Sequence, residues 1–365
     1  GYSLSFASGS IDHIVSMLSC LHFSLNMSQQ ETNMDLARFH RVQLAHLPTP
    51  LEPLEALSHH LGGPAIYVKR DDCTGLAGGG NKTRKLEFLM ADALEQGADT
   101  IVTVGATQSN HVRQTIAASA KLGLRSEVLL EKAVVRDDDY AGNGNILLDN
   151  LMGAIIHHCE PVDDLNVRGQ ALADELASAG AKSYFIPVGG SNRIGALGYA
   201  DCASEILGQS TEIGLDVDAI VVASGSQGTQ AGLLVGLASA GSKIPVHGIC
   251  VSRSAAEMIE AVFELAKKTA DYVGLSAPIL RGSVLCDDGY YAPGYGQPND
   301  GMIEAVTLCA RLEGLLLDPV YSGKAMSGLI GKIRDGTLNT GDTVIFLHTG
   351  GQVALHAYRS TFEGR

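Results

Sequence analysis

This chain of 365 residues lacks several features that mark particular classes of protein. It has no Trp, and aromatic residues make up only 5% of it. Its 26 Lys and Arg residues form no basic run and are outnumbered by 40 Asp and Glu, which gives a net charge of −14. Nucleic-acid binding and polybasic membrane attachment both need clustered positive charge. We therefore expect neither nucleic acid nor a membrane as a partner.

Cysteine is scarce and shows no spacing that indicates a framework. The chain has seven cysteines, an odd number, and none forms a Cys-x-x-Cys pair. A disulfide scaffold and a zinc site are both disfavoured, so we expect reduced cysteines and no metal. A cytoplasmic location is the expectation that goes with this pattern.

The chain also lacks a long uninterrupted apolar run. Residues 11–25 are mildly apolar, but one Asp and two His interrupt them, and the stretch is too short to span a bilayer. No basic leader precedes it and no small-residue cleavage site follows, so a secretory signal is not expected. Met27 and Met34 are both plausible native starts. We treat residues 1–33 as an N-terminal extension whose order and native origin the sequence leaves open.

Short β-rich runs alternate with longer helical patterns along the rest of the chain. This alternation predicts an α/β fold of two doubly wound lobes with mainly parallel sheets. In such sheets ligands bind outside the carboxyl ends of the strands, so functional residues should follow strands directly. The expected strands are residues 66–69, 100–104, 127–130, 154–157, 184–186, 219–223, 246–251 and 344–347.

A glycine-rich turn places a lysine at the start of an amphipathic run, where residues 78–86 read GGGNKTRKL. Glycine permits positive backbone angles and the close approach of a flat ligand, and a helix N-terminus favours nearby anions. An amine that is partly desolvated, or close to the cations Arg84 and Lys85, has a lowered pKa and can attack an aldehyde. Lys82 is therefore a candidate for covalent catalysis, although a solvated surface lysine fits this segment alone equally well.

Two further loops after predicted strands could hold anions. Residues 105–111 read GATQSNH and place Ser109, Asn110 and His111 at a helix start, where they could bind a carboxylate or simply cap the helix. Residues 224–229 read SGSQGT, which suits a phosphate monoester or forms only a tight turn. The P-loop spacing is missing, and no Gly-x-Gly-x-x-Gly opens the first βα turn, so a nucleotide ligand is disfavoured.

Two tyrosines and a threonine complete the set of candidate residues. Tyr290 lies in a loop rich in Gly, Pro and Tyr, and Tyr321 lies in the segment DPVYSGK. Near a cationic amine either phenol could act as a general acid or base, whereas loop tyrosines more often only pack. Residues 346–351 read FLHTGG, which ends a strand with Thr349 and two glycines and could form a wall for a flat ring.

These segments, in this order, resemble the fold-type II pyridoxal-phosphate (PLP) enzymes of the tryptophan synthase β superfamily. Within it they resemble the group of D-cysteine desulfhydrase, L-cysteate sulfo-lyase and 1-aminocyclopropane-1-carboxylate (ACC) deaminase. The resemblance runs from about Leu36 to Tyr358, and its motifs are GGNKTRK, QSNH, GSQGT, DPVYSGK and HTGG. It implies PLP in a cleft between the lobes and a homodimer. It also implies a large PLP-binding domain of residues 34–85 and 196–365, with residues 86–195 as a small domain.

The resemblance assigns roles to the candidate residues. Lys82 would carry the cofactor as an internal aldimine and later take the α-proton of the substrate. Tyr290 and Tyr321 would face the reacting carbon atoms, and Thr349 would meet the ring nitrogen, which discourages transamination and favours β-elimination. The remaining roles fall to residues that would bind the ring hydroxyl (Asn81), the phosphate (Ser224, Gly225, Ser226, Gln227, Gly228 and Thr229) and the substrate carboxylate (Ser109, Asn110 and His111).

The leading functional hypothesis is D-cysteine desulfhydration to pyruvate, sulfide and ammonia. Residues 186–192 and 292–296 look like the D-cysteine desulfhydrases, whereas residues 45–52 and 71–77 look more like the L-cysteate sulfo-lyases, which would release sulfite. ACC deaminase is disfavoured, because Ser322 stands where those enzymes have a glutamate. A PLP-binding protein without turnover is the alternative from a different class.

Overall fold

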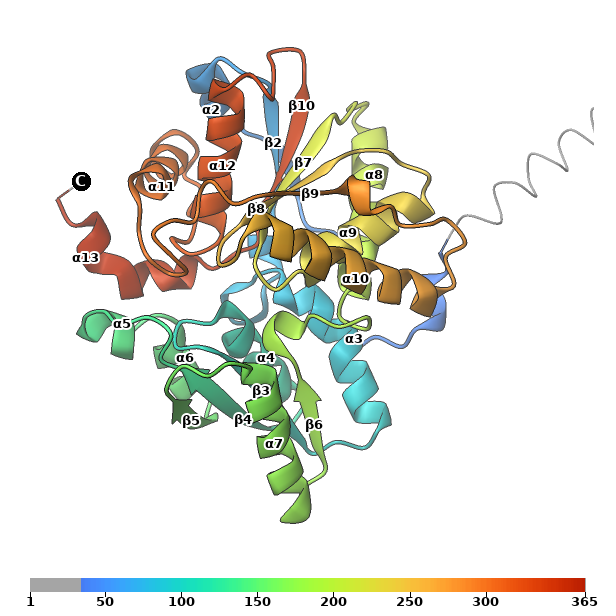
Figure 1. Ribbon diagram of the computed structural model, residues 1–365, viewed down its shortest axis with the longest axis vertical. Coiled ribbons are helices and arrows are strands. Elements are labelled where there is room, and N and C mark those ends of the chain that lie inside the picture. The colour runs from blue at the N-terminus through green and yellow to red at the C-terminus, as the bar shows by residue number, and fades with distance from the viewer. Residues whose placement is uncertain (1–33, 365) are drawn as a thin grey trace, which may run out of the picture.

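A computed structural model describes residues 34–364 and shows two β-sheets with their helices, one above the other in Figure 1. The expectations for residues 1–33, which concern their order and their native origin, lie outside the described residues. Within residues 34–364, no helix is long and apolar enough to cross a membrane.

The larger sheet has six strands in the order β1-β2-β10-β7-β8-β9. Only β1 and β2 pair antiparallel, and the other neighbours are parallel. The strands are β1 (Leu51–Pro53), β2 (Ala65–Lys69), β7 (Ala219–Ser224), β8 (Val246–Cys250), β9 (Val284–Asp287) and β10 (Thr343–Leu347).

The smaller sheet has four strands in the order β5-β4-β3-β6, all parallel. Its strands are β3 (Thr100–Ala106), β4 (Arg125–Glu131), β5 (Ile155–Cys159) and β6 (Ser183–Ile186). The central strand β3 is buried along residues 100–105, as expected for a strand covered on both faces.

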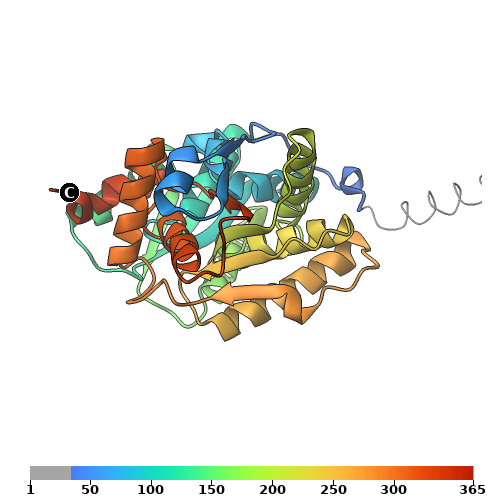
Figure 2. The same ribbon diagram turned by 90° about the horizontal axis from the view of Figure 1, so that it is seen from above.

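Helices cover both faces of the larger sheet, as the view from above shows (Figure 2). One apolar core lies between this sheet and α8 (Leu197–Glu212), α9 (Gly228–Ser239) and α10 (Ala255–Val273). A second core on the opposite face packs against α2 (Glu55–Leu61), α11 (Asp300–Glu313) and α12 (Ser322–Arg334). The other α-helices are α3 (Lys82–Glu95), α4 (Asn110–Lys121), α5 (Asp138–Gly142), α6 (Asn145–Leu151), α7 (Leu165–Ser178) and α13 (Arg359–Phe362).

Six short 3₁₀ segments lie among these elements: η1 (Leu36–Arg38), η2 (Asp71–Cys73), η3 (Leu76–Gly78), η4 (Val188–Gly190), η5 (Arg281–Ser283) and η6 (Gln352–Tyr358). Two of them matter most for the site. The segment η3 leads into the glycine turn before α3, and η4 follows β6.

The predicted α/β class and the mainly parallel sheets are confirmed. All eight predicted strands are present, whereas the short strands β1 and β9 were not predicted. Strands β3 to β6 form one sheet, and the strands before and after them in the chain form the other. The domain boundaries at residues 85/86 and 195/196 stay a prediction, and helix α3 runs across the first of them.

Candidate active site

A cavity of about 560 Å³ lies where loops that follow strands of both sheets meet. These loops include the ends of β3 and β6 from the smaller sheet and of β7, β8 and β10 from the larger one. Such a position at the carboxyl ends of strands is where open α/β sheets bind ligands. The lining contains most of the predicted site residues: Asn81, Lys82, Ser109, Asn110, His111, Ser224, Gly225, Ser226, Gln227, Thr229, Tyr321 and Thr349.

The turn before Lys82 requires glycine. Gly79 has φ of 73°, and a Cβ there would lie 1.9 Å from the carbonyl oxygen of Asp72. Gly80 has φ of 130°, and its amide donates to Thr74 Oγ1 at 2.8 Å. Residues with a side chain rarely adopt these positive φ angles, so the backbone of this turn requires glycine at both positions. The turn ends at Lys82, the first residue of helix α3.

Burial lowers the pKa of Lys82 to about 8, and the nearby Asp318 carboxylate opposes this shift more weakly. The Lys82 amine donates to the side-chain oxygen of Asn81 at 3.1 Å. Desolvation is therefore the main cause of the lowered pKa, rather than the positive charge of Arg84. A fraction of such an amine is neutral near pH 7 and can act as a nucleophile or a base.

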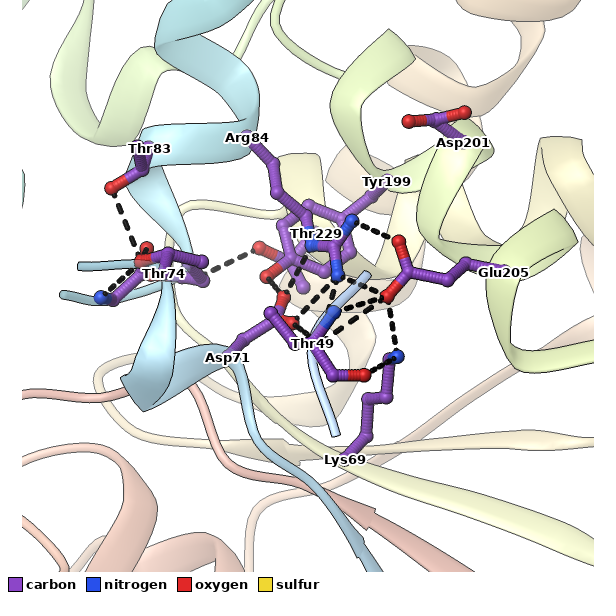
Figure 3. A network of polar contacts seen from close by, with 12 residues as sticks. Thr49, Lys69, Asp71, Thr74, Thr83, Arg84, Tyr199, Asp201, Glu205 and Thr229 are labelled. Atoms are coloured by element: carbon purple, nitrogen blue, oxygen red, sulfur yellow. Dashed lines mark hydrogen bonds and ion pairs between the residues drawn. The ribbon is translucent and has the colours of Figure 1, made fainter. Parts of the chain in front are cut away.

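Arg84 belongs to a separate buried network of ion pairs and hydrogen bonds, which Figure 3 shows near the start of α3. Its guanidinium donates to Asp71 at 2.9 Å and to Glu205 at 3.0 and 2.9 Å. Lys69 and Tyr199 donate to the same two carboxylates. The network joins α3 to α8 and to the loop after β2, and so fixes the helix that carries Lys82.

The loop after β7 forms an anion cradle at the start of α9. Ser191 Oγ donates to Ser226 Oγ at 3.0 Å and accepts from the Gly228 amide at 3.3 Å. A Cβ at Gly228 would lie 2.9 Å from the amine of Lys85, so this glycine allows the amine to approach the start of α9 closely. Ser224 differs from the other predicted phosphate residues, because its hydroxyl donates to Gln230 Oε1.

Lys85 is fully buried beside this cradle. Its amine donates to the Gly189 carbonyl at 3.1 Å and to Ser191 Oγ at 3.3 Å. Burial, and then the positive charge of Lys82, lower the pKa of Lys85 well below its usual value. An anion that enters the cradle would favour the charged amine and restore its proton.

Two hydrogen bonds of Asn81 join the lysine turn to the larger sheet. Its amide N–H donates to the Thr349 carbonyl at 3.0 Å, and its side-chain Nδ2 donates to Thr229 Oγ1 at 3.0 Å. Asn81, the residue next to Lys82, is thus linked to the segment after β10 and to the first turn of α9. Lys82 and Thr349 both line the cavity.

The predicted carboxylate site, Ser109 to His111, lies at the start of α4. Ser109 caps the helix, since its Oγ accepts from the Val112 amide at 3.2 Å. The amides of Asn110 and His111 lie in the first helical turn, where N–H groups have no partner within the helix. Ser109 can therefore cap the helix while the amides of Asn110 and His111 remain available to an anion.

The side chain of His111 does not suit carboxylate binding. Thr103 Oγ1 donates to the Ile186 carbonyl at 2.8 Å, so its contact of 2.8 Å with His111 Nε2 requires the histidine to donate. The other nitrogen, Nδ1, then has only a lone pair. Burial, followed by the charges of Lys82 and Lys85, lowers the pKa of His111 well below its usual value and keeps the ring neutral.

The loop tyrosine that lines the cavity is Tyr295 and not Tyr290, which corrects the prediction from sequence. Tyr295 and Tyr321 share a hydrogen bond of 2.6 Å between their hydroxyls, and burial raises the pKa of both phenols. Tyr290 instead packs on α12, where a Cβ at Gly331 would lie 2.2 Å from its hydroxyl. Its position five residues earlier in the same loop directs it into the core of the larger sheet.

Comparison with known proteins identifies this architecture. A family model described as "Pyridoxal-phosphate dependent enzyme" matches residues 42–350. The chain belongs to this family of PLP-dependent enzymes. The match contains every residue of the candidate site, from the glycine turn to Thr349.

Several relatives of this PLP-dependent enzyme are named D-cysteine desulfhydrase. Those from Salmonella paratyphi C and Salmonella typhi are each 49% identical to it over 324 residues, which cover 88% of this chain and 97% of each relative. A solved structure described as an ACC deaminase homologue is 38% identical, with a TM-score of 0.81, covering 89% of this chain and 96% of the other. O-ureido-L-serine synthase, at 17% identity and a TM-score of 0.61 over 88% of this chain and 95% of its own, shares the fold.

The residues of the cavity fit PLP. The cradle formed by Ser226, Gly228 and Lys85 has the donors that a phosphate needs, and Lys82, whose pKa is lowered, lines the same cavity as Ser226. Lys85 and Ser191 were not predicted as site residues. Lys85 lies in the first turn of α3, three residues after Lys82. Ser191 lies 106 residues after Lys85 along the chain.

Proposed function

We propose that this enzyme converts D-cysteine to pyruvate, sulfide and ammonia by β-elimination. The observation that carries the proposal is 49% identity to D-cysteine desulfhydrases over 88% of this chain and 97% of theirs. A site with a buried lysine, an anion cradle, a carboxylate site and a pair of phenols supports it.

The charges near the cavity favour a thiolate over a sulfonate as the leaving group. Arg113 lies behind Asn110, Arg193 stacks on Tyr272 with 4.7 Å to the ring centroid, and Arg281 pairs with Glu260 at 3.1 Å. None of these three arginines lines the cavity, and the arginine that does, Arg253, is solvent-exposed. Since a sulfonate needs additional donors, the lack of a buried arginine in the lining supports D-cysteine over L-cysteate, the alternative substrate.

Ring opening of ACC is less well supported. Ser322, which stands where the ACC deaminases have a glutamate, is fully buried and donates to Asp318 Oδ1 at 2.7 Å. This hydroxyl is committed to the start of α12 and is unavailable to a ligand in the cavity. Thr349, which lines the cavity, is left as the proposed partner of the ring nitrogen.

We propose the following roles for the residues in catalysis. Lys82 takes the α-proton, for which a pKa near 8 is well matched, because such an amine accepts a proton readily near neutral pH. Tyr321, paired with Tyr295, remains protonated because of its raised pKa and donates a proton to the departing sulfur. When bound, PLP supplies the electron sink that stabilises the α-carbanion.

The remaining proposed roles concern binding. The amides at the start of α4 and the Asn110 side chain receive the substrate carboxylate, and Asn81 binds the ring hydroxyl. Residues 224–229, with Lys85 and Ser191, hold the phosphate. His111 contributes its backbone amide and a neutral ring that packs against the site.

We further propose a homodimer and a cytoplasmic location. The six cysteines within the described residues are all free, which supports a reducing compartment. Sedimentation velocity of the purified protein tests the dimer, since a monomer would sediment at the rate of a 38.2 kDa chain.

The test of the proposed reaction is pyruvate release from PLP-loaded protein that is offered D-cysteine, L-cysteine, L-cysteate and ACC in parallel. We expect the highest kcat/KM for D-cysteine, with sulfide released in equal amount. Preference for L-cysteate would keep the cofactor and Lys82 but refute the leaving group. A protein with the visible absorbance of bound cofactor and no pyruvate from any of the four would support a non-catalytic PLP-binding protein instead.

A further inference from the structure

Arg113 is fully buried one helical turn after Asn110 and touches three parts of the site. Its Nη1 donates to Asn145 Oδ1 at 2.6 Å and to Asn110 Oδ1 at 3.2 Å. Its Nη2 donates to the carbonyl of Gly79, in the lysine turn, at 2.7 Å. Burial lowers the pKa of Arg113 to about 10, so the guanidinium still carries its charge near pH 7.

The contacts of Arg113 settle which way both asparagine amides face. A guanidinium has only donors, so the atoms of Asn110 and Asn145 that face it must be oxygens. The Asn145 amide nitrogen then faces the other way and donates to Asn110 Oδ1 at 2.9 Å and to the Gln108 carbonyl at 3.1 Å. Two donors thus converge on one oxygen of Asn110.

The nitrogen of Asn110 is consequently directed away from this pair. It lies beside Gly351, where a Cβ would come within 2.5 Å of it, and Asn110 lines the cavity together with Lys82. Within residues 34–364, the hydrogen bonds recorded for the Asn110 amide group are both accepted by its oxygen. The side chain therefore presents a donor to the cavity and keeps its acceptor hidden.

We propose that Arg113 and Asn145 are positioning residues that lock the Asn110 amide with its N–H₂ toward the substrate carboxylate. The inference rests on the proposed function, because it assumes an amino-acid substrate whose carboxylate binds at the start of α4. If the amide were reversed, an oxygen would face the carboxylate and repel it. The lock therefore selects ligands that carry a carboxylate at this position.

The test is the isosteric substitution Asn145→Asp, which replaces the donor to Asn110 with an acceptor. Arg113 can pair with the introduced carboxylate, so the buried charge is compensated and the fold should persist. The Asn110 amide then turns to donate to that carboxylate, and its oxygen faces the cavity. Asn143→Asp is the matched control, because the Asn143 side-chain oxygen only accepts from the Gly144 amide and a carboxylate can do the same.

The readout is binding, followed through the visible absorbance of the bound cofactor. Purified PLP-loaded proteins are titrated with D- and L-alanine, which have a carboxylate but no β leaving group, and with ethylamine, which has no carboxylate. We expect Asn145→Asp to weaken binding of the preferred alanine about tenfold to one-hundredfold, the loss of one charge-assisted hydrogen bond. Binding of ethylamine, and binding of both ligands to Asn143→Asp, should stay at the wild-type level.

Equal weakening for alanine and ethylamine, unchanged binding of alanine, or no wild-type preference for alanine over ethylamine would each overturn the inference. Asn145→Ala serves as a second variant, and we expect a smaller loss because Arg113 still holds the Asn110 oxygen. Failure of the proposed reaction is a separate outcome. A wild-type protein that binds alanine but releases no pyruvate from D-cysteine would refute the reaction and leave the amide lock standing.

Discussion

Replacing Lys85 with methionine should weaken PLP binding without changing the affinity for the same cofactor lacking its phosphate. The Lys85 amine lies beside Gly228 in the anion cradle and donates only to Gly189 and Ser191 within the described residues. Methionine has a similar length and can fill the buried space. Lys85→Met therefore removes the charged donor with little change in packing.

The size of the effect follows from the type of bond that is lost. A hydrogen bond to a charged group contributes about 1.5–3 kcal/mol, which corresponds to roughly a tenfold to 150-fold change in Kd. The free protein should lose little stability, because burial already disfavours the charged amine, as its lowered pKa shows. The variant should thus fold normally and bind PLP about 10 to 150 times more weakly.

The assay is reconstitution of the apoprotein with PLP or with pyridoxal, monitored by the visible absorbance that appears on binding. Lys85→Met should raise the Kd for PLP and leave that for pyridoxal unchanged. Lys121→Met, at an exposed position near the end of α4, is the control and should alter neither. If the variant weakened PLP and pyridoxal equally, Lys85 would support the pocket as a whole rather than bind the phosphate.

Three further predictions concern catalysis and stability. Tyr321→Phe should keep the visible band but lower kcat for D-cysteine about one-hundredfold or more, and a wild-type kcat would exclude this phenol as the proton donor. Lys82→Ala should lose both the band and pyruvate release, whereas the exposed Lys268→Ala should keep both. Burial raises the pKa of Asp149 to about 8, so folding favours its protonated form, and stability from this group is lost as pH rises from about 4 towards 8. The wild type should therefore lose stability relative to Asp149→Asn as the pH rises from 5 to 8, by up to ~1.4 kcal/mol per pH unit. Urea unfolding of both proteins at pH 5 and pH 8 measures this difference, and an equal change in the free energy of unfolding of the two proteins would contradict it.

Features set by local backbone chemistry could be predicted from the sequence. The apolar runs in β3 and β10 identified buried parallel strands, because such strands are apolar on both faces. The glycine turn located Lys82, since the positive φ angles of Gly79 and Gly80 are a local requirement. Strand β1 has only three residues and ends in a proline, and β9 ends in an aspartate. Pro and Asp are depleted in strands, so neither run was identified.

Features that depend on contacts through space could not be predicted. Ser191 reaches the cradle from the segment after β6, and no spacing rule links it to Lys85. Tyr290 and Tyr295 are equivalent by residue type and lie in one irregular loop, so only the folded path shows that Tyr295 faces Tyr321. The role of Lys82 stays a prediction, and its burial and lowered pKa fit that role. Arg84 does not cause the lowered pKa, because carboxylates neutralise its charge in the network of Figure 3.

The two ends of the ligand site belong to different sheets. The cradle and Thr349 follow β7 and β10 of the six-stranded sheet, while Asn110 follows β3 of the four-stranded sheet. Under the proposed roles, retention of the cofactor and choice of the amino acid are encoded in separate stretches of sequence. We therefore expect mutations around α4 and α6 to change which amino acid is accepted while the visible absorbance of the bound cofactor persists, so a screen for new substrates should vary residues 105–111 and 145–149 first.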